Sequence, residues 1–72
     1  MTGVYEGFDR HTVLEQLEWV RAGGETNMMD RAGVRRTADA AGMRELVEFV
    51  NEKSAEHYME ALEDMGARRG GP

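Results

Sequence analysis

The sequence has 72 residues, a formal net charge of −5 and no cysteine. This length corresponds to a single domain with a small hydrophobic core, which gains stability when a partner or a second copy covers part of its surface. The absence of cysteine excludes disulfide bonds and thiolate metal sites, and the acidic balance disfavours nucleic acid as a partner unless the basic residues cluster.

No stretch of the sequence approaches the roughly 20 apolar residues of a membrane-spanning helix. The first ten residues, MTGVYEGFDR, lack a basic region followed by an apolar run, so they do not predict a secretory signal. We therefore expect a cytoplasmic protein that does not bind membranes.

Residues 1–8 are too short and too rich in glycine to predict a regular element. We expect a flexible arm whose Tyr5 and Phe8 pack onto the body, and the alternative is an arm that is free to bind a partner. The composition of residues 67–72 predicts a disordered tail. Between these two ends, residues 9–66 form the expected helical domain.

The first helix follows the arm, and its apolar stripe at helical spacing consists of Val13, Leu14, Leu17 and Val20. Either Asp9 or Thr12 can cap its N-terminus, and Thr12 would form a capping box with Glu15. Residues 23–24 are both glycine and predict its end, because glycine adopts the left-handed conformation of a C-cap. Trp19 lies off the centre of the stripe, at the edge of the core or as an exposed anchor.

The segment ETNMMD predicts the turn before the second helix. Asp30 is the expected N-cap of that helix and Asn27 is its rival. With Asp30 at the cap, Met29 can form a hydrophobic staple with Val34, while Met28 points towards the first helix or the solvent. Methionine is flexible and suits adaptable contact surfaces, so an exposed anchor for a partner is the alternative role of this turn.

Gly42 is expected to end the second helix, and the densest apolar cluster of the chain follows it. The polar run NEKSAEH then divides residues 43–65, where Ser54 can cap a new helix. We therefore expect two helices here in preference to one bent helix. The predicted fold is all-α, a compact bundle of three to four short helices with flexible termini. Its expected core consists of Leu14, Leu17, Val20, Met29, Val34, Ala38, Leu46, Val47, Val50, Tyr58 and Leu62.

Catalytic or metal chemistry has little support in the sequence. His11 and Glu15 lie four residues apart and His57 lies three before Glu60, but a metal site needs at least three convergent ligands. Ser54 is the only serine, and its neighbours do not resemble a nucleophile elbow. We therefore expect no catalytic, cofactor or metal site, and a protein that is not an enzyme.

The segment VRRTADAAGMRELVEFV resembles a helix-turn-helix unit, because Ala38 and Gly42 lie four residues apart with a helix expected on either side. The plainer alternative is two helices that meet at a glycine corner. In the helix-turn-helix alternative, the protein is a small DNA-binding regulator that contacts nucleic acid through Arg31, Arg35, Arg36 and Arg44. Glu45, Glu48 and Glu52 on the expected recognition helix oppose it, because phosphates flank the major groove. The acidic residues that continue along the following helix could also imitate nucleic acid, and an ordinary solvated face explains them as well.

The leading hypothesis is a non-catalytic protein-interaction module that binds a protein partner or associates with itself. A small core, six methionines and a tryptophan off the main stripe favour a domain that buries a patch on another chain. The candidate partner-binding residues are Trp19, Thr26, Asn27 and Met28.

The turn ETNMMD, the segment GVRRTADAAGMRELVEFV and the later tyrosine together resemble DUF5049, a small family of unknown function in bacteria and phages. The matching residues are Thr26, Asn27, Met28, Asp30, Val34, Ala38, Glu45, Leu46, Val47, Phe49, Val50 and Tyr58. Met29 departs from the pattern, because it replaces the usual aromatic residue. The resemblance covers about residues 13–62 and implies a viral or proviral setting, but it implies no mechanism.

Overall fold

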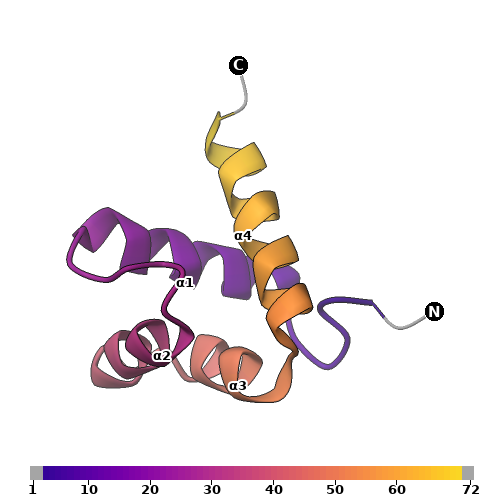
Figure 1. Cartoon of the computed structure of the whole chain (residues 1–72). Helices are drawn as coiled ribbons and strands as arrows, with labels where there is room; N and C mark the ends of the chain where they lie inside the picture. The colour runs from indigo at the N-terminus through magenta and orange to yellow at the C-terminus, as the bar shows by residue number, and fades with distance from the viewer. Residues whose placement is uncertain (1–2, 71–72) are drawn as a thin grey trace.

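The computed structural model describes residues 3–70 and contains four helices (Figure 1). They are α1 (Arg10–Gly23), α2 (Arg31–Ala40), α3 (Arg44–Glu52) and α4 (Ala55–Gly70). The predicted all-α class and the division of residues 43–65 into two helices are confirmed. α1 packs against each of the other three helices, and α2 packs against α3.

α1 begins after Asp9, whose side chain makes no capping hydrogen bond, and ends at a glycine C-cap. The Thr12 hydroxyl donates a hydrogen bond of 2.5 Å to the carboxylate of Asp9, which is the N-cap residue. Thr12 lies inside the helix, so the capping box predicted from Thr12 and Glu15 does not form. At the other end, Gly24 adopts a φ of 75° and its N–H bonds to the carbonyl of Arg21, as expected for a glycine C-cap.

α2 ends in a Schellman motif that turns the chain into α3. The N–H of Met43 bonds to the carbonyl of Ala38 at 2.8 Å, and the N–H of Gly42 bonds to that of Asp39 at 3.1 Å. Gly42 has a φ of 76°, which glycine adopts without strain. The predicted end of the second helix at this glycine is confirmed.

Ser54 separates α3 from α4 in the predicted way. Its hydroxyl oxygen accepts a hydrogen bond of 3.2 Å from the N–H of His57, which satisfies a free amide in the first turn of α4. The helix then continues to Gly70, beyond the predicted domain end at residue 66, so residues 67–70 are helical in place of the expected irregular tail. The ends of the predicted arm and tail, residues 1–2 and 71–72, lie outside the described residues.

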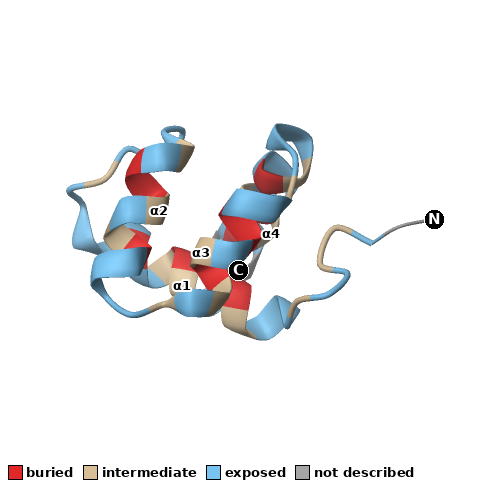
Figure 2. Cartoon of the chain, turned by 90° about the horizontal axis from the view of Figure 1, so that it is seen from below, coloured by how far each residue is buried: buried red, intermediate tan, exposed pale blue. Residues whose placement is uncertain are grey.

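The buried positions lie mainly on one side of each helix, and the exposed positions lie on the other (Figure 2). The core contains Val13, Leu14, Leu17, Val20, Val34, Ala38, Leu46, Phe49, Val50, Tyr58, Ala61 and Met65. Val47 and Leu62 were expected in this core and are partly buried against it. The prediction of a buried Met29 was wrong, because that side chain is 63% exposed.

The N-terminal arm packs onto the body, as one of its two alternatives predicted. The ring of Tyr5 stacks on Phe49 with 5.7 Å between centroids, and Phe8 contacts the same ring edge-on at 5.5 Å. The Tyr5 hydroxyl donates a hydrogen bond of 2.7 Å to Asp64 on α4. Burial and this bond raise the pKa of Tyr5, so the hydroxyl stays protonated at neutral pH.

Two side-chain to backbone hydrogen bonds join α1 to α3. Gln16 accepts a bond of 2.9 Å from the N–H of Leu46, which lies in the first turn of α3. Glu45 on α3 accepts a bond of 2.7 Å from the N–H of Asp9 at the start of α1. Each helix therefore satisfies a free amide near the other helix's N-terminus.

Candidate partner-binding surface

The turn between α1 and α2 is held by its own polar side chains. The Asn27 side-chain oxygen accepts a hydrogen bond of 2.9 Å from the N–H of Met29, and its backbone carbonyl accepts one from Asp30. The hydroxyls of Thr26 and Thr37 are 2.8 Å apart and share a hydrogen bond between the turn and α2. Thr26 and Asn27, predicted to bind a partner, thus each fix the shape of this turn.

The two methionines of the turn differ in burial, and the staple prediction for Met29 was wrong. Met28 packs against the core, whereas the predicted staple residue, Met29, points into solvent. Asp30 is the N-cap as predicted, but its side chain makes no capping hydrogen bond. The turn at Asn27 and a contact from α4 together determine which of residues 28 and 29 faces the core. The predicted staple between Met29 and Val34 considered neither of these contacts.

The contact from α4 is a hydrogen bond of 2.6 Å from the Tyr58 hydroxyl to the backbone carbonyl of Met28. Burial raises the pKa of Tyr58 to about 12, so its hydroxyl remains a donor at neutral pH. Tyr58 comes from α4 and lies 30 positions away in the sequence. The bond closes the turn onto the body and draws Met28 inward.

Trp19 presents the largest aromatic side chain of the protein to solvent, with 56% of its surface exposed. It borders a hollow of about 250 Å³ between α1, the turn and α2. The lining residues are Trp19, Val20, Gly23, Glu25, Thr26 and Thr37. An aromatic ring beside a hollow is the arrangement that protein partners commonly cover.

A second hollow of about 410 Å³ lies next to the first and shares three of its lining residues. The shared residues are Glu25, Thr26 and Thr37, and the second hollow extends to Asp30 and Arg36. We call the continuous surface formed by Trp19 and these five residues the Trp19 face. The Trp19 face combines one apolar anchor with hydroxyl groups and charges of both signs. The sequence did not predict Glu25 and Thr37 as members of this face, because a hollow between two helices leaves no pattern in the sequence.

The four arginines predicted to contact nucleic acid do not share one environment. Arg31 turns inward, and its guanidinium donates hydrogen bonds of 3.2 Å to the carbonyl of Val50 and 3.1 Å to that of Lys53. These carbonyls lie at the C-terminal end of α3, where a positive charge is favourable. Arg31 thus joins α2 to α3, and only part of its side chain is exposed.

The other three arginines line three different hollows. Arg35 borders one between α2 and α3, Arg36 belongs to the Trp19 face, and Arg44 lies beside Asp39 and Glu48. The structure therefore does not gather the four into one basic patch. α2 and α3 nevertheless pack against each other on either side of the Gly42 corner.

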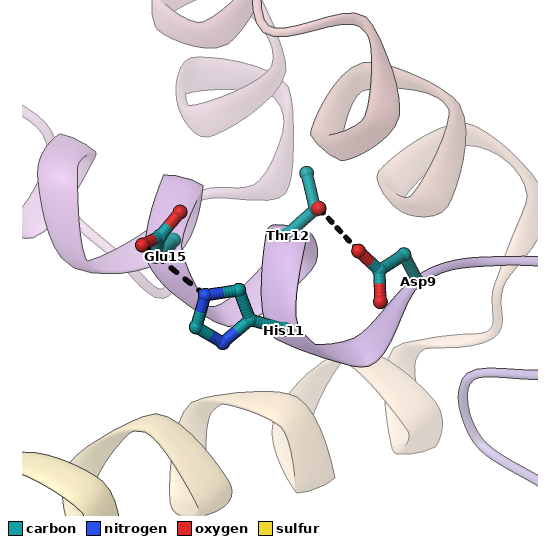
Figure 3. A network of polar contacts seen from close by, with 4 residues as sticks. All are labelled: Asp9, His11, Thr12 and Glu15. Atoms are coloured by element: carbon teal, nitrogen blue, oxygen red, sulfur yellow. Dashed lines mark hydrogen bonds and ion pairs between the residues drawn. The ribbon is translucent and has the colours of Figure 1, made fainter.

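The polar residues at the start of α1 form solvated pairs (Figure 3). His11 Nε2 lies 3.3 Å from Glu15 Oε2, and both side chains are more than half exposed. Next to this pair, the hydrogen bond from Thr12 lowers the pKa of the Asp9 carboxyl. Within the described residues, no group of three histidine, aspartate or glutamate side chains could hold a metal ion, and no helix is both long and apolar enough to cross a membrane.

Comparison with protein families matches residues 10–61 to the model described as "Domain of unknown function (DUF5049)". The matched range includes the turn between α1 and α2 with its two methionines, Met28 and Met29, and it includes Tyr58 on α4. Neither the comparison with curated proteins nor that with solved structures gives a match.

Proposed function

The chain belongs to the DUF5049 family, and we propose that it is a non-catalytic protein-interaction module that binds its partner through the Trp19 face. The observation that carries this proposal is the exposed indole of Trp19 beside one hollow, which adjoins a second. The same proposal includes a cytoplasmic location and the viral or proviral setting that the family resemblance implies.

Covering Trp19 would contribute a substantial part of a binding free energy. A tryptophan side chain buries roughly 200 Å² in an interface, so an exposed fraction of 56% corresponds to about 100 Å². At roughly 25 cal/mol per Å², burial of this surface contributes about 2.5 kcal/mol. Energies of this size are typical of the few anchor residues that dominate protein interfaces.

The turn supports the Trp19 face as a rigid platform. Thr26 is fixed to Thr37 on α2, and the carbonyl of Met28 is fixed to Tyr58 on α4. A surface held from three helices loses little conformational entropy when a partner covers it. The residues shared with the family pattern thus build the platform, and Trp19 is the anchor upon it.

The test is affinity capture of a partner from nuclease-treated lysate of the source organism by the tagged protein. Trp19→Ala should weaken capture at least about tenfold, because it removes the anchor. Met29→Ala is the matched control, since Met29 is also exposed but lines neither hollow of the Trp19 face. Equal capture by wild type and Trp19→Ala would refute the proposal, provided that circular dichroism shows both proteins folded.

The alternative function that we propose is DNA binding, which two helices packed on either side of the Gly42 corner would support. Arg36 and Arg44 are exposed, but Glu48 and Glu52 are also exposed on α3, the helix that would enter the major groove. This alternative predicts that Arg35→Glu combined with Arg36→Glu abolishes binding to duplex DNA, and that affinity falls steeply with salt. Capture that disappears after nuclease treatment would favour it over the protein-interaction proposal.

A further inference from the structure

A small basic hollow lies between α2 and α3, apart from the Trp19 face. It has a volume of about 240 Å³ and is lined by Arg31, Ala32, Arg35, Val50 and Asn51. Its apolar part comes from an alanine and a valine, and two arginines lie around it without any acidic residue. We call it the α2–α3 hollow.

The arginines of the α2–α3 hollow retain unused hydrogen-bonding capacity. Arg31 binds two carbonyls through Nη2 alone. Arg35 lies four residues later on the same face of α2 and makes no ion pair with any side chain that the structure describes. The hollow therefore suits carboxylates that approach together with an apolar group.

α4 carries a face with the complementary chemistry. Glu56, Met59, Glu60 and Glu63 lie at spacings of three and four residues, so they form one stripe on the helix. All four are exposed, and Met59 is 38% exposed. None of the three glutamates forms an ion pair with a described side chain. We call this stripe the α4 acidic face.

The two surfaces match in charge and in sequence spacing. Arg31 and Arg35 are separated by four residues on one helix, and Glu56 and Glu60 are separated by four on the other. Met59 adds an exposed apolar side chain beside the two glutamates, and Ala32 and Val50 add apolar lining to the α2–α3 hollow. Contact between these apolar groups would accompany the two ion pairs.

We infer that the α4 acidic face of one molecule docks into the α2–α3 hollow of a second copy of this chain. Single surface ion pairs contribute little, but two pairs around a buried methionine combine electrostatic complementarity with apolar burial. Each molecule carries both halves of the contact, so the protein associates with itself, and the Trp19 face remains available for another partner.

Sedimentation velocity of the purified full chain over a range of concentrations measures this association. The wild type should form dimers or larger species. Arg35→Glu should weaken this association and raise its dissociation constant at least about tenfold. Arg36→Glu is the matched control, because it makes the same charge change at the next residue, outside the hollow. Met59→Ala should likewise weaken association, whereas Met29→Ala and Trp19→Ala should leave it unchanged.

A charge exchange identifies the two surfaces as each other's partners. Glu56→Lys combined with Glu60→Lys should also associate at least about tenfold more weakly alone, and its equimolar mixture with Arg35→Glu should associate more tightly than either variant alone. The inference is overturned if the wild type is monomeric up to about 1 mM, if Arg36→Glu weakens association as much as Arg35→Glu, or if the mixture associates no more tightly than the separate variants. Each of these results would leave partner capture through Trp19 unaffected, so this inference and the proposed function fail separately.

Discussion

Replacement of Arg31 by methionine should destabilise the fold, although the sequence alone suggested a DNA-contacting residue. Methionine retains much of the apolar stem but removes the hydrogen bonds to the carbonyls of Val50 and Lys53. Hydrogen bonds from a charged group contribute about 1.5–3 kcal/mol each when well shielded. Arg31 is partly exposed, so we expect the free energy of unfolding to fall by about 2 kcal/mol for the pair.

This loss corresponds to a decrease in Tm of about 8–16 °C for a domain of this size. Urea unfolding followed by circular dichroism, at low protein concentration, gives the free energy directly. Arg36→Met is the matched control, because Arg36 is exposed on the same helix and makes no ion pair with a described side chain. A difference between the two variants below about 0.5 kcal/mol would refute the assignment of Arg31 as the link between α2 and α3.

Three further predictions concern the caps, the packing and the pH dependence of the fold. Gln16→Leu should cost about 1 kcal/mol in urea unfolding, because it leaves an amide of α3 without its acceptor; an unchanged unfolding midpoint would contradict this. Gly33→Ala should be neutral or stabilise by up to about 1 kcal/mol. The added methyl would lie 2.8 Å from the movable carboxylate of Asp30 and at an ordinary contact distance of 3.6 Å from the methyl of Thr26. A loss above that size in thermal unfolding would show that this carboxylate is fixed. Tyr58 has a raised folded pKa of about 12, so its contribution to stability is complete below the unfolded value of 10.0 and is lost as the pH rises through this interval. Ultraviolet titration of the Tyr5→Phe variant, which leaves Tyr58 as the only tyrosine, should detect its ionisation near pH 12, and ionisation near pH 10 would argue against its burial.

The helices and their boundaries followed from local signals in the sequence. The glycines after α1 and α2 and the serine before α4 act on amides and carbonyls within a few residues of themselves, so their effects could be predicted without the fold. The apolar stripe of α1 identified most of its buried residues for the same reason. Thr12 was assigned wrongly as a possible cap because its spacing to Glu15 fits a capping box, while Asp9 was also a good cap.

The contacts that place the helices against one another were not predictable in the same way. Gln16 and Arg31 bind backbone groups 30 and about 20 residues away, and no spacing rule connects such pairs. The exposure of Met29 has the same origin, because the hydroxyl that holds the neighbouring Met28 against the body belongs to α4. Trp19 was correctly singled out as a residue off the stripe, but only its neighbours in space show that it borders a hollow.

The most direct test of the account is photo-crosslinking from position 19. A photoreactive phenylalanine analogue replaces Trp19 in the full chain, and the same analogue at His11, which is exposed on the same helix, is the control. The account predicts one dominant protein adduct from position 19 in nuclease-treated lysate, and little or none from position 11. The absence of a protein adduct at position 19, or equal adducts from both positions, would contradict the assignment of the Trp19 face as the partner-binding surface.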